Sequence, residues 1–241
     1  MLMRILGFLW LLLAPAVGLA GADFNVLVFS KTAGYRHASI EAGVTAIGEI
    51  GGQDGFRVDA TEDAAAFSDD NLGKYRVVVF LDTTGEVLDA TGQAAFERFI
   101  RRGGGFVGIH SATDTGYEWP WFGGLVGNYF RRHPPIQRAT LRVVDPSHPS
   151  TRHLPIEWKR TDEWYDFRHD LAPDVTVLMR IDETTYWGGR MGAMHPMAWH
   201  HEYDGGRAWY TALGHTVESW SEPFFLDHVR GGIAWAAGVK D

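Results

Sequence analysis

The sequence predicts an α/β fold in which a mostly parallel central sheet is flanked by helices and carries an added β-hairpin. Its first half alternates compact apolar runs with helix-periodic segments joined by short loops, which is typical of parallel strands with right-handed crossovers. Its second half contains Asp204-Gly205 between two apolar segments, and this dipeptide favours a tight hairpin turn. No internal repeat, low-complexity segment or clear linker interrupts residues 23–241, which we therefore interpret as one domain.

Four apolar runs in the first half predict strands, and helical segments lie between them. The strands are expected at residues 24–30, 56–60, 75–81 and 106–109, and the helices at 39–50, at 64–72 and after a cap at Asp89 or Thr91. A Glu97/Arg101 pair at i,i+4 supports the third helix. The glycines at 103–105 suit a left-handed helix ending that returns the chain to the sheet.

Polar segments follow three of these strands, at residues 31–37, 82–86 and 110–114. The carboxyl ends of parallel strands share one edge of a sheet, and ligands bind beyond that edge in open α/β folds. We therefore expect the three segments to meet at one rim. His110, which ends the apolar run 106–109, is the residue of most interest there, and its structural alternative is a histidine that only caps a strand.

The second half is less regular. Strands are expected at residues 139–144, from 156 towards 165, and at 175–181; the hairpin pairs 196–203 with 206–214 and leads to His215, and a last helix spans 222–237.

The N-terminus has the pattern of a secretory signal peptide. A basic residue, Arg4, precedes a short apolar run, and small residues follow up to Ala22, so residues 1–22 are expected to be removed before Asp23. The alternative is a retained membrane anchor, but the run is shorter than the roughly 20 residues that span a bilayer. We expect a secreted or periplasmic protein with no stable membrane span after cleavage.

Composition excludes several chemistries. The chain has no cysteine, so it has no disulfide, no thiolate nucleophile and no cysteine-based zinc site. Its formal net charge of -8 makes nucleic acid an improbable partner. The 11 histidines and 10 tryptophans are high counts for 241 residues, and aromatic faces are surfaces on which sugar rings stack. The composition thus favours, weakly, a carbohydrate ligand.

Five motifs resemble one known family. They are GYRHAS at 34–39, GGGFVGIHSATDT at 103–115, HP at 133–134, DEWY at 162–165 and PMAWHHEYDGGRAWYTALGH at 196–215. With the closing helix, they resemble the ThuA-like (trehalose utilisation) family, whose flavodoxin-like fold is similar to that of class I glutamine amidotransferases. The resemblance implies a role in sugar catabolism rather than one defined reaction.

The same resemblance argues against amidotransferase activity. Those enzymes carry a nucleophilic cysteine at a strand-to-helix elbow, where this chain has His110, and a late histidine that corresponds to His215. Without a thiolate, glutamine hydrolysis by that route has no nucleophile.

Three chemistries remain open for the rim. His110 and His215 can serve as general acid and base with Glu163 or Asp114 as their carboxylate partner. Alternatively His37, His110, His215 and Glu163 form a pool of ligands for a divalent metal such as zinc or manganese, although no local HExxH-like spacing is present. A Ser111 nucleophile is the weakest option, because the sequence lacks a GxSxG elbow.

We expect further residues around the rim to contact substrate. These candidates are Arg36, His37, Asp114, Tyr117, Trp119 and His133. Four have a structural alternative: Arg36 could pair with Asp82 or Glu86, His133 could cap a turn, and Tyr117 and Trp119 could belong to a packed loop. The leading hypothesis is a secreted enzyme that acts on a small glycoside or keto-sugar by histidine and carboxylate acid-base chemistry. A non-catalytic sugar-binding protein and a metal-dependent hydrolase are the alternatives, and the sequence gives no oligomeric state.

Overall fold

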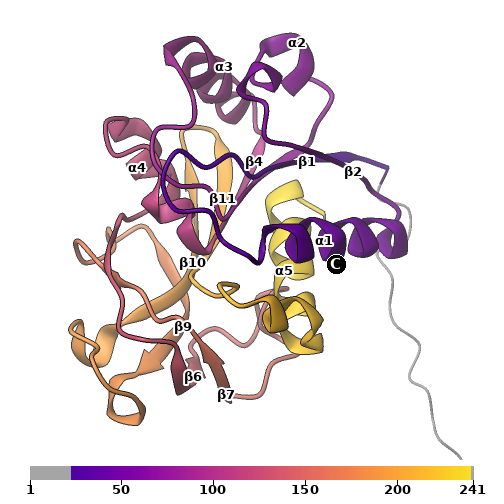
Figure 1. Cartoon of the computed structure of the whole chain (residues 1–241). Helices are drawn as coiled ribbons and strands as arrows, with labels where there is room; N and C mark the ends of the chain where they lie inside the picture. Colours follow the sequence, from indigo (N-terminus) through magenta and orange to yellow (C-terminus); the bar gives the residue numbers. More distant parts are fainter. Residues whose placement is uncertain (1–22, 240–241) are drawn as a thin grey trace, which may run out of the picture.

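The structure is a computed structural model that describes residues 23–239. The signal peptide expected at residues 1–22 lies outside the described residues. Nine strands form one sheet in the order β2-β1-β3-β4-β11-β10-β9-β6-β7, and helices pack against it (Figure 1). The α/β fold class and the central sheet flanked by helices are confirmed.

Most predicted elements are present. The strands of the large sheet are β1 (Asn25–Phe29), β2 (Arg57–Thr61), β3 (Val77–Leu81), β4 (Gly105–Ile109), β6 (Gln137–Val143), β7 (Glu157–Asp162), β9 (Thr176–Asp182), β10 (Pro196–Tyr203) and β11 (Gly206–Thr211). The helices are α1 (Ile40–Asp54), α2 (Asp69–Leu72), α3 (Ala90–Arg101), α4 (Pro120–Val126) and α5 (Pro223–Ala237). Of the two expected caps for α3, Asp89 is the one observed, and its carboxylate accepts a hydrogen bond from the backbone N–H of Gly92.

The first five strands of the sheet order run parallel, and their carboxyl ends form the predicted rim. Leu81 of β3 is in register with Ile109 of β4, and Ile109 is in register with Thr211 of β11. The residues that come next along each strand, Asp82 and His110 among them, therefore emerge side by side. The apolar strands β3 and β4 are fully buried, as their continuous hydrophobic runs predict.

The hairpin is also confirmed, and the sheet continues beyond it. Tyr203 pairs with Gly206 across a turn in which Asp204 and Gly205 both have positive φ, as a two-residue hairpin turn requires. From β11 outwards, β10, β9, β6 and β7 pair antiparallel. After these alternations β7 again runs in the direction of β11, so its carboxyl end points towards the same rim.

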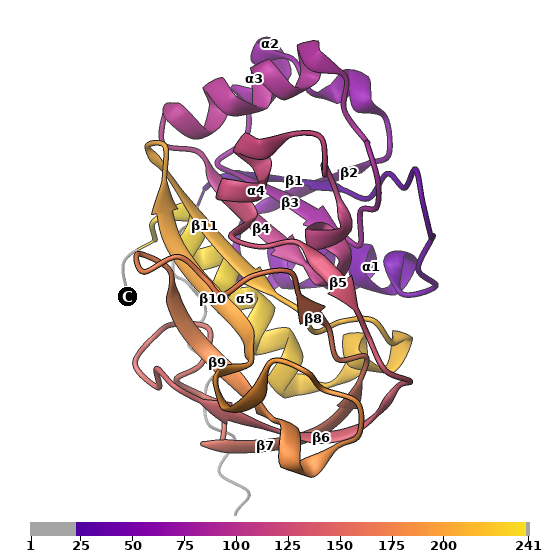
Figure 2. The same cartoon turned by 90° about the vertical axis from the view of Figure 1, so that its left-hand side faces the viewer.

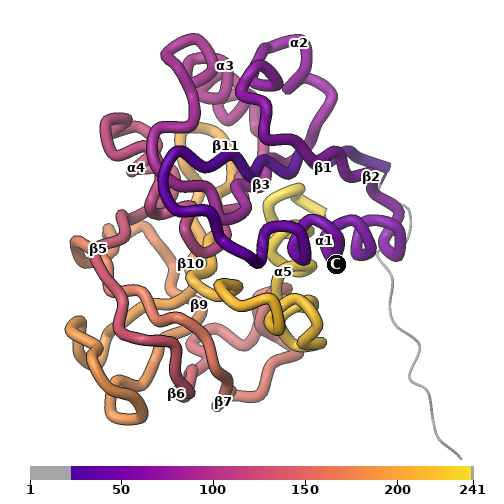
Figure 3. The backbone as a smooth tube through the Cα atoms, viewed as in Figure 1, coloured from indigo at the N-terminus to yellow at the C-terminus, as the bar shows by residue number. Residues whose placement is uncertain are grey.

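The helices lie on the two faces of this sheet. On one face, helix α1 packs on β3, helix α5 packs on β3, β4 and β11, and the two helices contact each other. Helices α3 and α4 cover the opposite face (Figure 1). Figure 3 traces the wide loop between β1 and α1, which carries His37. Within residues 23–239, no helix is both long and apolar enough to cross a membrane.

A second, two-stranded sheet lies beside the rim. It pairs β5 (Phe130–Arg132) with β8 (Asp166–Phe167) in front of the large sheet (Figure 2). The sequence does not predict these strands, because such short segments carry no readable alternation.

Candidate functional site

Four side chains from four distant segments meet at the rim. His37 comes from the loop before α1, His110 directly follows β4, Glu163 directly follows β7, and His215 follows β11. One potential ligand atom from each lies within 4.8 Å of those of the other three. We call these residues the histidine–glutamate cluster. The structure thus brings together the pool of ligands named from the sequence.

The separations within the cluster fit a divalent metal ion. Nε2 of His110 lies 3.0 Å from Nδ1 of His215, and Oε2 of Glu163 lies 3.5 Å from the first atom and 3.2 Å from the second. Ligand atoms held about 2.0–2.2 Å from a tetrahedral zinc ion lie roughly 3.3–3.6 Å from one another. Imidazole nitrogen and carboxylate oxygen are also the donor types that zinc and manganese accept. The arrangement therefore has the chemistry of a metal site, and its separations of 3.0–3.5 Å lie within about 0.3 Å of that spacing.

The backbone at His110 sets the direction of its ring. His110 has a φ of 48°, in the left-handed region that a residue other than glycine seldom adopts, and it begins the 3-10 turn η2 (His110–Asp114). Its Nδ1 donates a hydrogen bond of 2.8 Å to the carbonyl oxygen of Ala212. In the neutral ring the proton then sits on Nδ1 and leaves the lone pair on Nε2, which faces the cluster. This strained turn occupies the elbow position that the family resemblance assigned to His110.

The cluster stabilises the ionised carboxylate of Glu163. Burial alone would raise the pKa of Glu163, but its polar contacts with His110, His133 and His215 outweigh that effect, and the pKa lies well below its usual range. Burial alone would lower the pKa of His110, but the carboxylates of Glu163 and Asp82 outweigh that effect and raise it. The site is thus built around a fixed negative charge surrounded by imidazoles.

His37 closes the cluster on the side of the β1–α1 loop. Its ring stands perpendicular to those of His110 and His215, with ring centroids 4.9 and 5.1 Å apart. Burial is the main cause that lowers the pKa of His37 to about 2, so its ring stays neutral. The hydroxyl of Ser111 lies 3.4 Å from its Nδ1 and is buried, which gives a Ser111 nucleophile no access to substrate.

His133 contacts the cluster from its solvent side. Its Nδ1 lies 2.9 Å from Oε1 of Glu163 and 3.0 Å from the carbonyl oxygen of Pro134. Both neighbours are acceptors, so this nitrogen carries a proton. The His133 side chain is 41% exposed, which leaves it open to a bound molecule.

Two predicted substrate contacts, Arg36 and Trp119, have protein partners outside the cluster. Arg36 pairs with Glu41 at 2.8 Å and Glu62 at 2.9 Å, whereas Asp82, one of its expected partners, is fully buried. Trp119 belongs to the packed loop instead: its side chain is buried and its indole N–H donates to Glu97 of α3. Its ring packs against the rings of Phe96, Trp121 and Phe122.

Asp114 and Tyr117 lie beside the site but bind each other. The Tyr117 hydroxyl donates a 2.6 Å hydrogen bond to the Asp114 carboxylate, and the Arg168 guanidinium stacks 4.1 Å over the Tyr117 ring. Between them and the cluster lie Phe130 and Tyr165, which pack on each other. The ring centroid of Tyr165 lies 4.2 Å from that of His110. Asp114 and Tyr117 therefore form an outer wall rather than part of the cluster.

Three site residues were missed from the sequence. Asp82 is fully buried with a φ of 51°. One of its oxygens accepts from Ser39, the other has no hydrogen-bond partner among residues 23–239, and burial raises its pKa to about 6. Tyr165 packs on His110, and Asp162 contacts the loops of Glu163 and His215. Asp82 follows an apolar run and Asp162 precedes Glu163 in DEWY, so a weak signal existed for both.

A second group of possible metal ligands, formed by Asp166, Glu183 and His195, is already occupied by protein partners. Glu183 Oε1 accepts from two backbone N–H groups and lies 2.8 Å from His195, and Asp166 pairs with Arg132 at 2.7 Å. The other ring nitrogen of His195 lies 2.8 Å from the carbonyl oxygen of Tyr165. This group supports the loop behind the cluster.

Comparison with known families agrees with this fold. The family model ThuA, described as trehalose utilisation, matches residues 25–236. The chain belongs to the ThuA family. Membership suggests a role in carbohydrate utilisation at the level of the family. No curated protein matches the chain.

Solved structures show the same fold for this ThuA-family chain. A ThuA-like protein from Bacteroides uniformis has a TM-score of 0.76 at 24% identity, with 88% of this chain and 91% of that chain covered. A ThuA-like protein from Parabacteroides merdae has a TM-score of 0.72 at 22% identity, with 89% and 90% covered. A protein described as part of a GMP synthase from Thermoplasma acidophilum has a TM-score of 0.54 at 13% identity, with 89% and 94% covered.

Proposed function

We propose that this ThuA-family protein is a divalent-metal-dependent enzyme that acts on a small glycoside or a keto-sugar. The observation that carries the proposal is the convergence of His37, His110, Glu163 and His215, with separations that suit one zinc or manganese ion. Three imidazoles around one carboxylate are more than an acid-base pair needs. They match the set of three or four protein ligands found at catalytic metal sites.

The protein residues around the ion have separate tasks. A bound divalent ion would polarise a substrate oxygen or lower the pKa of a bound water. The Ala212 carbonyl holds the ring of His110 in one tautomer, and His133 holds Glu163 from the opposite side. His133 is exposed, and its hydrogen bond with Glu163 raises its pKa, so it is the group best placed to donate a proton to substrate.

Tyr35 offers a surface for a sugar ring. Its side chain is 67% exposed, and its ring lies 4.9 Å from that of His37. The loop beneath it is fixed by Thr84, whose hydroxyl donates to the Tyr35 carbonyl and accepts from the Gly34 N–H. The Tyr35 ring is exposed to solvent, lies on a fixed loop and is next to the polar cluster. It can therefore stack on a ligand that has an apolar face, such as a pyranose.

Acid-base catalysis without a metal is the second candidate. It is favoured by the short contact of His110 with His215 and by the hydrogen bonds that Glu163 accepts from the histidines. These contacts form a connected proton-exchanging network even when no ion is present.

Turnover assays separate these proposals. Wild type and His110→Ala should be incubated with a panel of disaccharides, glycosides and keto-sugar derivatives, before and after treatment with a chelator. We expect turnover by wild type, loss on chelation, recovery with Zn²⁺ or Mn²⁺, and no turnover by His110→Ala. Full activity of chelated, metal-free wild type would support acid-base catalysis instead. Saccharide binding with no product would support a non-catalytic binding protein.

We also propose export of the protein, on the pattern of residues 1–22. Cell fractionation and N-terminal sequencing test it. We expect a periplasmic or secreted protein that begins at Asp23, and a cytoplasmic protein that begins at Met1 would overturn it.

A further inference from the structure

We propose that Asp162 is the positioning residue that holds Glu163 and His215 at the separation the cluster needs, with Arg160 and Ser219 keeping its carboxylate in place. This inference rests on the proposed function of the cluster. One of the two measurements that test it, the NMR spectrum of the histidine rings, does not depend on metal.

The sheet itself does not fix the distance between Glu163 and His215. Glu163 follows β7, the edge strand, and His215 follows β11, and β10, β9 and β6 lie between these two strands in the sheet order. β7 and β11 therefore share no direct backbone hydrogen bonds and are connected only through these three strands. A small change in the twist of the intervening strands would alter the separation of the two ligands.

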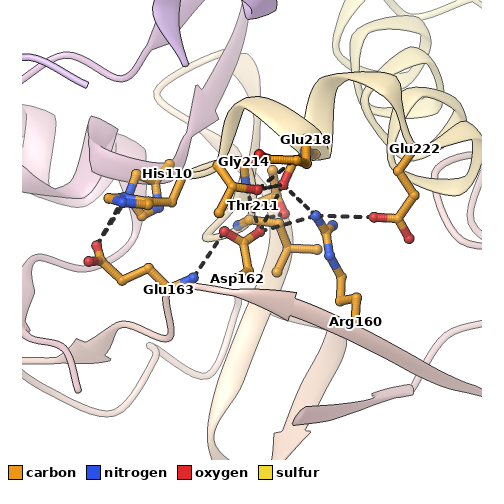
Figure 4. Close-up of polar contacts among 12 residues, drawn as sticks. His110, Arg160, Asp162, Glu163, Thr211, Gly214, Glu218 and Glu222 are labelled. Carbon is orange, nitrogen blue, oxygen red and sulfur yellow. Dashed lines mark hydrogen bonds and ion pairs between the residues drawn. The ribbon is translucent and has the colours of Figure 1, made fainter. Parts of the chain in front are cut away.

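Asp162 spans this gap directly. Its Oδ1 accepts a 3.0 Å hydrogen bond from the N–H of Glu163, and its Oδ2 accepts a 2.9 Å hydrogen bond from the N–H of Gly214. Gly214, whose φ is 107°, immediately precedes His215. One carboxylate thus binds the backbone of both ligand-bearing segments, and Figure 4 shows it between Glu163 and Gly214.

The carboxylate is held by a buried cation. Nη2 of Arg160 lies 3.2 Å from Oδ2 of Asp162, donates to the Ser219 hydroxyl at 2.6 Å and lies 3.3 Å from Glu222 (Figure 4). The Ser219 hydroxyl in turn donates to Asp162 at 3.4 Å. Both Asp162 and Arg160 are buried, so removing either charge leaves its partner poorly solvated.

The arginine is also fixed by packing. Its guanidinium lies 4.7 Å from the ring centre of Trp158 and 4.9 Å from that of Phe225. Trp158 lies on β7, the strand that also carries Arg160 and Asp162, and Phe225 lies on α5, so the guanidinium is held by two aromatic side chains that are not part of the cluster. The position of Asp162 is therefore determined by the fold and not by a bound ligand.

A purely structural role for Asp162 is the competing explanation. Asp54 provides a matched control, because it is also a buried carboxylate that pairs with an arginine, Arg230, at 3.0 Å, and it lies on α1 outside the site. Asp54→Asn should therefore reproduce the loss of a buried carboxylate that pairs with an arginine, without affecting the cluster.

The test compares Asp162→Asn with Asp54→Asn and wild type in two measurements. The first is calorimetric titration of the metal-free proteins with Mn²⁺ and with Zn²⁺. Loss of a partner that orients metal ligands commonly weakens metal binding about 10- to 100-fold, and we expect this for Asp162→Asn at unchanged stoichiometry. Asp54→Asn should bind as wild type does. Equal affinity of Asp162→Asn and wild type would overturn the inference.

The second measurement needs no metal. NMR spectra that correlate ring nitrogens and protons report the environment of each histidine in the metal-free proteins. We expect the ring signals of His110 and His215 to shift in Asp162→Asn and to stay unchanged in Asp54→Asn. Unshifted signals would overturn the inference. If wild type binds no metal but the signals shift, the metal-dependent function fails while the positioning role of Asp162 stands.

Ser219→Ala keeps the inference testable if Asp162→Asn does not fold. It removes the hydroxyl that links Arg160 to Asp162 and that also lies 2.8 Å from the Thr216 hydroxyl, while the direct 3.2 Å contact between Arg160 and Asp162 remains. We expect a smaller shift of the same histidine signals, and no shift would overturn the role of Ser219 and Asp162 in positioning the cluster.

Discussion

Nε2 of His110 and Nδ1 of His215 lie 3.0 Å apart although 105 positions separate these residues in the chain. The contact follows from the fold, because β4 and β11 are parallel neighbours and each histidine leaves the sheet at the same rim. Two ring nitrogens at this distance must share a proton or a common ligand. Glu163 lies within 3.5 Å of both, so the pair already faces a fixed negative charge.

Replacing His133 should weaken metal binding without abolishing it. His133 contacts Oε1 of Glu163, the carboxylate oxygen on the side away from His110 and His215. Loss of such an orienting contact commonly costs about 10- to 100-fold in affinity, and we expect His133→Ala to fall in that range with unchanged stoichiometry. Calorimetry provides the measurement. His153→Ala, a half-buried histidine outside the site, is the control, and equal affinities of both variants would contradict the role of His133.

Truncating Tyr35 should affect substrate binding more than turnover. If a sugar ring stacks on Tyr35, Tyr35→Ala loses a contact of about 0.5–1.5 kcal/mol, which corresponds to a roughly two- to twelvefold rise in KM at similar kcat. Tyr35→Phe keeps the ring and should resemble wild type. Phe224→Ala, an exposed aromatic residue elsewhere, serves as the control. A fall in kcat with constant KM would instead place Tyr35 in the chemical step.

Trp119 should act on stability alone. Trp119→Phe keeps an aromatic ring but loses volume and the hydrogen bond to Glu97. We expect the free energy of unfolding to fall by about 1–3 kcal/mol, with saccharide affinity unchanged. Urea denaturation and ligand titration check the two expectations. A variant of normal stability that has lost saccharide binding would restore the sequence-based assignment of Trp119 as a substrate contact.

Buried His228 should make the protein less stable in acid. Its ring lies between the Ser150 carbonyl at 2.7 Å and the Thr211 hydroxyl at 3.2 Å, and burial lowers its pKa from 6.5 to about 3. The unfolded chain binds a proton below pH 6.5, whereas the folded chain does not until about pH 3. The contribution of His228 to stability is therefore complete above pH 6.5 and is lost as the pH falls towards 3.

The effect can be measured by urea denaturation of wild type and His228→Gln at pH 7.5 and pH 5. The His228 contribution to the pH dependence should be about 2 kcal/mol over this interval. His228→Gln should have a lower stability at pH 7.5 but a smaller loss on acidification. The same loss in both proteins would show that His228 is not the group responsible.

The sequence predicts the parallel half of the fold and its rim because these features are local. His110 ends an apolar run, and Asp204-Gly205 identifies the hairpin that brings His215 to the same edge. Apolar periodicity and turn chemistry are short-range signals, and they place strand ends correctly even where strand boundaries shift by a residue or two.

Other features depend on contacts that no local pattern encodes. Glu163 reaches the rim only because the sheet carries β7 back towards β11. The hydrogen bond between Asp162 and the N–H of Gly214 follows from the same long-range arrangement. Arg36 and Trp119 have the right chemistry for a sugar site. Arg36 has one near partner, Glu41, but Glu62 and Glu97 lie more than 20 residues from Arg36 and Trp119, and only the tertiary structure shows these contacts.

The most direct test of the account is whether the four cluster residues hold one divalent ion. Calorimetric titration of metal-free wild type and Glu163→Gln with Zn²⁺ and Mn²⁺ measures this. We expect one ion per chain in wild type, and an affinity more than about a hundredfold lower in Glu163→Gln, because that variant loses the only charged ligand of the cluster. The absence of saturable binding in wild type, or equal affinity in the two proteins, would contradict the account.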